Sequence, residues 1–248
     1  MDPTARARVW AERLSARISP SDLERVSRSM LAGIDQVSNA RWDAAVERVQ
    51  ALPDGVRPEK LKAITDSFAR ELGAFGAGVG AVAATPAIGT ATTLMAATVE
   101  LAWFTGRVGD MILTVAALHG RPAPTVEERR AWMLAVLIYG GSARDGFARA
   151  VNEAGTGLTT PATQLPLSTL RTVNRLLTPQ LARRYGARRG AVALGTAIPL
   201  GIGAIIGGSA NYMAVRALAR HADEFFAHMP YSAIDTNAVE VGGFISGG

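Results

Sequence analysis

The sequence predicts an all-α fold, a multi-helix bundle in which two Gly/Ala-rich, proline-bent hydrophobic helical hairpins pack together. Apolar residues recur at helical spacing along most of the 248-residue chain. No alternating strand pattern of useful length appears before the C-terminal tail. Two runs, 72–99 and 190–215, contain no charged residue, and each holds a proline near its middle. These three observations together predict the bundle.

The first 57 residues are predicted to be an N-terminal helical region. Ser19 followed by Pro20 is typical of a helix start, because proline fits the first turn, where its missing N–H costs nothing. An apolar stripe at helical spacing then runs from Leu23 to Val49, and the turn residues 53–55 end it.

Residues 58–230 are predicted to be the main helical domain. It opens with a short amphipathic helix from Pro58 to Leu72, followed by the first uncharged run. A helical pattern then continues from Thr90 to Leu118. The sequence Thr125-Val126-Glu127-Glu128 is a capping box and predicts a helix that reaches about Tyr139.

The last third of the chain is predicted to contain a connector, two helical segments and a tail. Residues 143–166 are the least periodic internal part, and residues 154–166 within them are predicted to be a flexible connector. Helical periodicity resumes near Leu167, and a final amphipathic helix ends near Pro230. Residues 231–248 are predicted to be a flexible C-terminal tail.

Composition narrows the possible chemistry and partners. The chain has no cysteine, which excludes disulfides and thiolate sites, and its first residues lack the apolar core of a signal peptide. Of 26 basic residues only Lys60 and Lys62 are lysine. This bias fits either a GC-rich genome or attraction to an anionic surface. Aromatic residues do not alternate with the arginines, so nucleic acid is not expected as a partner.

Each uncharged run is long enough to cross a bilayer, since about 20 apolar residues suffice. Strongly apolar residues are sparse among the Ala, Gly and Thr, so both runs are marginal spans. A buried or re-entrant hairpin is favoured, with a true span as the alternative. Small residues spaced by four let helices approach closely. The residues expected to pack or bend the helices are Gly76, Gly80, Pro86, Pro199, Gly203 and Gly207.

A few polar residues stand inside or beside these apolar segments. We expect a buried polar network, because an ionisable group is costly to bury unless it is paired. Glu100 and Arg107 are seven residues apart on one helix face, so they are the expected pair. The expected network comprises Glu100, Arg107, Asp110, Ser209 and Asn211. The arginines expected to bind lipid headgroups are Arg183, Arg184, Arg188 and Arg189.

Two groups of motifs within residues 60–229 carry a family resemblance. The N-terminal group runs from Thr85-Pro86 through Glu100-Leu101 to Gly140. The more specific C-terminal group comprises Ala187 to Gly190, Ile198 to Ala204, Ser209 to Tyr212, and Ala222 to Phe226. On these motifs, residues 60–229 resemble the EcsC family of bacterial proteins. The resemblance implies a helical, membrane-associated accessory protein of unassigned activity, with a membrane protein or exporter component as a possible partner. Family members often have Ala-Asp where this chain has Val99-Glu100, so the carboxylate is kept on a side chain one methylene longer.

Motifs for catalysis and cofactors are weak. The glycine-rich segment 78–83 lacks the preceding strand of a dinucleotide fold. Residues 140–144 and 207–211 each miss the last glycine of a serine-hydrolase elbow. His221, Glu224 and His228 share one helix face, but a zinc site would need a ligand from another segment. We expect no catalytic residue, cofactor or metal.

Three functions stay open from the sequence. The favoured one is a non-enzymatic, membrane-associated accessory protein that contacts anionic lipid through the hairpins and flanking arginines. The second is a soluble helical carrier that binds a lipid or another apolar ligand in a glycine-lined interior. The third is an enzyme with an unrecognised site. The expected location is the cytoplasm, at the inner face of the cell membrane.

Overall fold

The computed structural model describes residues 20–83, 90–122, 124–155, 164–195, 202–229 and 232–234. Within these ranges the regular secondary structure is helical apart from one pair of three-residue strands, which confirms the predicted all-α class. The helices are α2 (Pro20–Ala40), α3 (Trp42–Gln50), α4 (Arg57–Ala83), α5 (Thr90–Leu118), α6 (Val126–Tyr139), α7 (Ala143–Glu153), α8 (Leu167–Gly195) and α9 (Ile202–Ala227), with a 3-10 turn, η1, at Gly140–Ser142.

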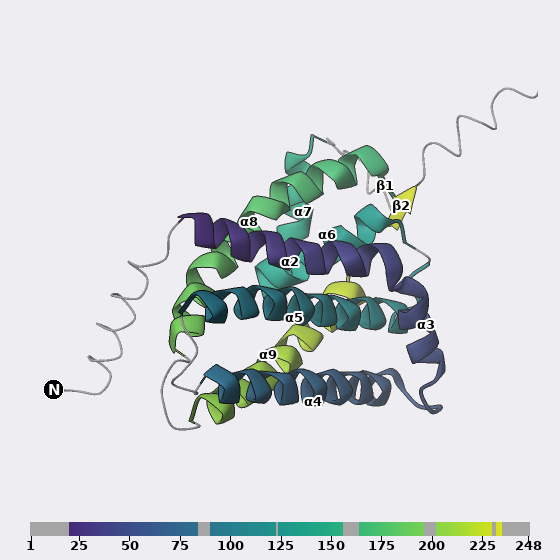
Figure 1. Ribbon diagram of the computed structural model, residues 1–248. Helices are drawn as coiled ribbons and strands as arrows, with labels where there is room; N and C mark the ends of the chain where they lie inside the picture. Colours follow the sequence, from purple (N-terminus) through teal and green to yellow (C-terminus); the bar gives the residue numbers. More distant parts are fainter. Residues whose placement is uncertain are drawn as a thin grey trace, which may run out of the picture.

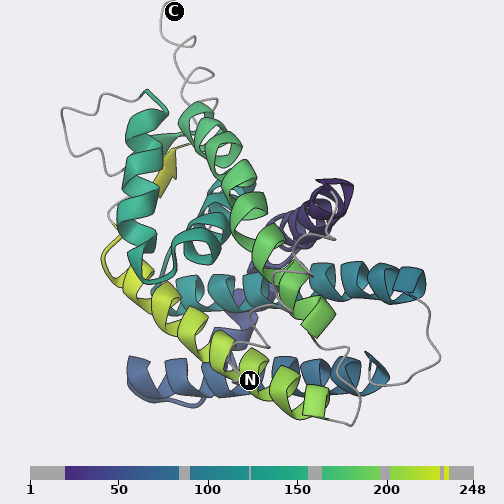
Figure 2. The same ribbon diagram turned by 90° about the vertical axis from the view of Figure 1, so that its left-hand side faces the viewer.

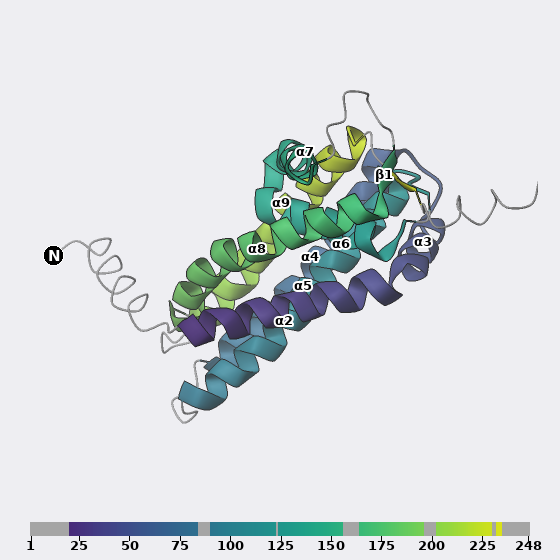
Figure 3. The same cartoon turned by 90° about the horizontal axis from the view of Figure 1, so that it is seen from above.

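Helix α5 lies in the middle of the bundle and contacts α2, α3, α4, α6 and α9 (Figure 1). Helices α4 and α9 pack along one another on one side of α5. Helix α8 packs on α6, α7 and α2 and covers the opposite side (Figure 3). The apolar core is continuous across residue 57, since Met30 and Ile34 of α2 belong to the same buried cluster as Ile64 and Phe68 of α4.

The crossing of α2 and α5 depends on a glycine that the sequence analysis did not single out. A Cβ at Gly33 would collide with the backbone carbonyl oxygen of Ala102. Gly106 lies opposite, but a Cβ there would meet only ordinary contacts at 3.5 Å and beyond. The two helix backbones therefore approach closely because Gly33 has no side chain.

One predicted helix start and one predicted helix end are confirmed, and two other helices differ from the prediction. Thr125 caps α6, accepting a hydrogen bond from the backbone N–H of Glu128 at 3.2 Å. Helix α9 ends at Ala227, near the predicted stop. The stripe at 23–49 is interrupted at Arg41, and because α2 and α3 both face α5 the apolar period continues across the break. Helix α4 continues beyond Leu72 to Ala83, because the alanines of this segment favour helix and no proline interrupts it.

The prediction that residues 143–166 are the least periodic internal part was wrong for residues 143–153. Residues 143–153 form α7, which buries Phe147 and Val151 on one face with three small residues. Because most of that face is alanine and glycine, the pattern was easily overlooked. Two short strands were also missed: β1 (Gln164–Pro166) and β2 (Ser232–Ile234) pair in parallel, with Leu165 opposite Ala233.

The uncharged runs meet at one end of the molecule. Helices α4 and α8 end there, and α5 and α9 begin there (Figure 1). Figure 2, which looks onto this end, shows the same four helix ends grouped together. The predicted bends at Pro86 and Pro199 lie outside the described residues. Among the described helices, none has an apolar stretch long enough to cross a membrane.

Candidate functional site

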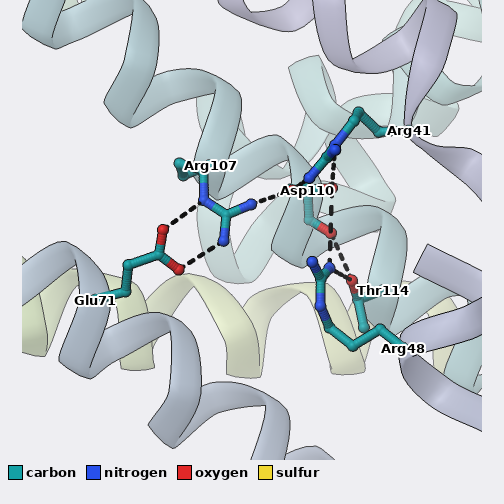
Figure 4. A network of polar contacts seen from close by, with 6 residues as sticks. All are labelled: Arg41, Arg48, Glu71, Arg107, Asp110 and Thr114. Carbon is teal, nitrogen blue, oxygen red and sulfur yellow. Dashed lines mark hydrogen bonds and ion pairs between the residues drawn. The ribbon is translucent and has the colours of Figure 1, made fainter. Parts of the chain in front are cut away.

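The most strongly connected polar cluster of the described residues surrounds Asp110 in the middle of α5 (Figure 4). This carboxylate is buried, with a residue exposure of 1%. Arg41, at the break between α2 and α3, lies 2.9 Å from Oδ2. Arg107, one turn earlier on α5, donates to the same oxygen. Arg48 of α3 lies 3.9 Å from Oδ1. Asp110 therefore joins α5 to the two N-terminal helices.

A second carboxylate extends the cluster to α4. Glu71 accepts two hydrogen bonds from Arg107, at 2.8 and 2.6 Å, in a bidentate pair. The guanidinium carbons of Arg48 and Arg107 lie 5.0 and 4.9 Å from the ring centre of Phe68. Arg107 thus links two carboxylates on different helices and covers an aromatic ring of the core.

Thr114 completes the cluster on the far side of Asp110. Its hydroxyl donates to the Asp110 carbonyl oxygen at 2.7 Å and accepts from Arg48 at 3.1 Å. The hydrogen bond to Asp110 raises the pKa of Arg41 above its ordinary value. Arginine stays protonated at neutral pH, so the three guanidinium groups of the cluster are permanent positive charges. Its chemistry is ion pairing that fixes four helices.

A second polar cluster lies at the other end of α5, where His119 follows the helix. His119 Nε2 is 2.8 Å from Asp223 Oδ1 on α9, and Nδ1 is 3.4 Å from the Arg57 guanidinium. Because a guanidinium only donates, Nδ1 is the acceptor and Nε2 carries the proton given to Asp223. Burial lowers the pKa of His119, and the Asp223 carboxylate opposes this. The imidazole is therefore neutral at pH 7, with both nitrogens engaged.

Arg121 stabilises the end of α9 beside this histidine. It donates to the carbonyl oxygen of Phe226, in the last turn of α9, at 2.8 Å and to that of Met229, just beyond the helix, at 2.6 Å. The last carbonyl groups of a helix have no partner within the helix. Burial lowers the pKa of Arg121. The helix ends at this side of the molecule are thus held by specific polar contacts.

The structure describes the side chains of some of the predicted polar residues and not of others. Arg107 and Asp110 lie in one network, and their described carboxylate and guanidinium partners are Glu71, Arg41 and Arg48. Glu100 lies in α5 and both Ser209 and Asn211 in α9, but their side chains are outside the described set. The same holds for Arg183, Arg184, Arg188 and Arg189 in α8 and for Gly76, Gly80, Gly203 and Gly207 in α4 and α9.

Sequence reasoning missed Arg41, Arg48, Glu71 and His119. One signal was available: Arg41 and Arg48 are seven residues apart, so they lie on one side of the predicted N-terminal stripe. A buried Asp110 needs a cation, and a pair of arginines on a helix facing α5 supplies it.

The helix face with His221, Glu224 and His228 lines a cavity of about 190 Å³. In the described part of the chain, no three His, Cys, Asp or Glu side chains gather closely enough to hold a metal ion.

Comparison with known proteins gives no match to a protein-family model, to a curated protein or to a solved structure. The resemblance to the EcsC family therefore stays a prediction.

Proposed function

We propose that this protein is a non-enzymatic, membrane-associated helical accessory protein whose uncharged end enters one leaflet of an anionic membrane. The observation that carries the proposal is the convergence of four uncharged helix segments at one end of the bundle (Figures 1 and 2). These segments are 72–83 of α4, 90–99 of α5, 190–195 of α8 and 202–215 of α9.

The lengths of these segments fit one leaflet better than a whole bilayer. At about 1.5 Å per residue they extend about 18, 15, 9 and 21 Å from the helix ends. The hydrocarbon core of a bilayer is about 30 Å thick, so one leaflet contributes about 15 Å. An end of this depth favours a protein that dips into one side of the membrane.

Side chains at the border of this end fit a membrane interface. Trp103 is 37% exposed and stacks on Phe75, with ring centroids 3.9 Å apart. Met213 on α9 is 70% exposed. Aromatic rings are enriched where hydrocarbon gives way to headgroups. One turn farther from the end, Glu71 and Arg107 form the first described ion pair on α4 and α5.

The arginines of α8 supply the electrostatic part of the proposal. Arg183, Arg184, Arg188 and Arg189 precede the uncharged segment of α8 in sequence. Each is worth about 1 kcal/mol near an anionic surface. The resemblance to the EcsC family agrees with such a role and adds a membrane protein or exporter component as a possible second partner.

Flotation with vesicles tests this proposal. We expect the full chain to float with vesicles of phosphatidylglycerol and phosphatidylcholine at low salt, and less at high salt. Replacing the four α8 arginines by glutamine should weaken partitioning by up to about 4 kcal/mol, on the order of a thousandfold. The matched control replaces four exposed arginines away from this end: Arg57, Arg144, Arg149 and Arg220.

Tryptophan fluorescence reports the depth of the contact. We expect vesicles to shift the emission of the wild type to the blue, and Trp103→Phe to lose most of the shift. Absence of wild-type flotation at low salt would refute the proposal. If the protein fails to float but carries a co-purified lipid in native mass spectrometry, the carrier function would replace it.

A further inference from the structure

An arginine-lined groove runs between the start of α6 and the first half of α8, helices that pack side by side (Figure 3). Its volume is about 730 Å³. Three arginines line it, Arg130 from α6 with Arg171 and Arg175 from α8. Among the described lining residues, Glu127 carries the only carboxylate. The groove therefore has an excess of positive charge.

The local carboxylates neutralise two of the three arginines. Arg130 pairs with Asp35 of α2, and Arg171 Nε lies 3.6 Å from Glu127 Oε1. Arg175 donates to the Thr172 hydroxyl at 2.9 Å and has no carboxylate partner among the described residues. One guanidinium is thus left without a counter-charge inside the groove.

Asn174 holds the single carboxylate of the groove in place. Its amide N–H groups donate to the Glu127 side chain at 2.7 Å and to the Glu127 carbonyl oxygen at 3.0 Å. Asn174 is 5% exposed, and its Oδ1 is buried with no hydrogen-bond partner among the described groups. Glu127 is therefore fixed beside Arg171 and cannot swing freely to neutralise Arg175.

The accessible donors suit phosphoryl oxygens. Arg171 and Arg175 are four residues apart, so they project from the same face of α8. The Arg171 side chain is 62% exposed, and one contact leaves most of its five N–H donors available. Guanidinium groups bind phosphate in a forked geometry. The volume exceeds that of one phosphate and admits a ligand with two.

We propose that this groove binds a ligand bearing two phosphoryl groups, held by Arg171 and Arg175 with Arg130 on the facing helix. The site is separate from the membrane contact proposed above. Arg175 lies 20 residues before the end of α8, or about 30 Å along the helix. The two proposals can therefore fail independently.

Calorimetric titration of the full chain with pyrophosphate at low ionic strength tests the site. We expect saturable binding at one site, weakened at least tenfold in Arg171→Gln/Arg175→Gln. The matched control, Arg216→Gln/Arg220→Gln, removes two exposed arginines of the same spacing from α9 and should bind as the wild type does. Arg171→Lys/Arg175→Lys keeps the charge but loses the fork, so it should restore only part of the affinity. Circular dichroism melts show that each variant is folded.

A second arm distinguishes a free diphosphate from a lipid headgroup. It repeats the comparison with vesicles of phosphatidylcholine carrying a lipid with a diphosphate headgroup. Dependence on Arg171 and Arg175 with free pyrophosphate supports a soluble ligand, and the same dependence only with these vesicles supports a headgroup. If neither probe binds, or if both double glutamine variants lose affinity equally, the proposal is overturned.

Discussion

Helix α5 passes from an uncharged end of the bundle to a charged one. Its first ten residues, Thr90 to Val99, contain no ionisable group. Farther along, Asp110 receives three guanidinium groups, and His119, just beyond the helix, bonds to Asp223. At the charged end, Asp110, Arg107 and His119 each bond to a side chain on another helix or at a helix break. At the other end the sequence offers almost only Ala, Gly, Thr and aliphatic residues.

The two ends differ in the interactions that determine how their helices pack. Ion pairs and hydrogen bonds have direction, so the charged end fixes which helices meet and in what register. An uncharged end made of small residues gains stability only from close packing or from contact with an apolar phase. Under the proposed function, stability is concentrated at the charged end and membrane binding at the uncharged end.

The largest effect should come from removing the charge of Asp110. Asp110→Asn keeps the shape but leaves three arginines without their central counter-charge. Breaking a fully buried pair costs about 3–5 kcal/mol. Since the Arg41 side chain is 41% exposed, we expect a loss of about 2–3 kcal/mol in unfolding free energy, measured by urea denaturation.

Glu24→Gln is the matched control for Asp110→Asn. Glu24 pairs with Arg28 one turn away, and both side chains are about 70% exposed. We expect a change below about 0.5 kcal/mol. Vesicle binding per folded molecule should be unchanged in both variants. A strong loss of vesicle binding in folded Asp110→Asn would break the division between the two ends.

The next effect concerns the crossing of α2 and α5. Gly33→Ala puts a methyl group against the Ala102 carbonyl oxygen, so the helices must separate. We expect a loss of about 1–3 kcal/mol, as for overpacked cores. Gly106→Ala places a methyl group at the same crossing, where it makes only ordinary van der Waals contacts. It should therefore gain up to about 1 kcal/mol in unfolding free energy from helix propensity. Equal losses in the two variants would contradict the close approach at Gly33.

The sequence allowed the helical class and several helix ends to be predicted because these depend on local chemistry. The cap at Thr125 and the stop near Pro230 are examples. Arg107 and Asp110 could be identified as costly to bury, but periodicity relates only residues of one helix. Periodicity therefore predicted a pair of Arg107 with Glu100 inside α5. It could not predict the described partner on another helix, Glu71, which is 36 residues away from Arg107. The partners Arg41 and Arg48 depend on how α2 and α3 pack on α5.

The smallest expected effect is a loss of unfolding free energy at mildly acidic pH, caused by a histidine of the charged end. Burial holds the pKa of His119 below its ordinary value of 6.5, so the unfolded chain takes up a proton at a higher pH than the folded protein. The unfolded state therefore binds more protons as the pH falls below about 6.5, and the unfolding free energy decreases. Urea denaturation at pH 7.5 and 5.5 should show this loss.

Three variants test whether His119 causes that loss. His119→Gln keeps an N–H donor for Asp223 but cannot take up a proton, so the difference between the two pH values should shrink. The matched control is His228→Gln, which removes an exposed histidine just beyond the end of α9. Asp223→Asn removes the carboxylate that favours the imidazolium, which lowers the pKa of His119 further and should steepen the loss. A wild type more stable at pH 5.5 than at pH 7.5, with His119→Gln abolishing that gain, would mean that Asp223 outweighs burial. His119 would then be an ion-paired cation, and the charged end would be held by one more charge pair than we infer.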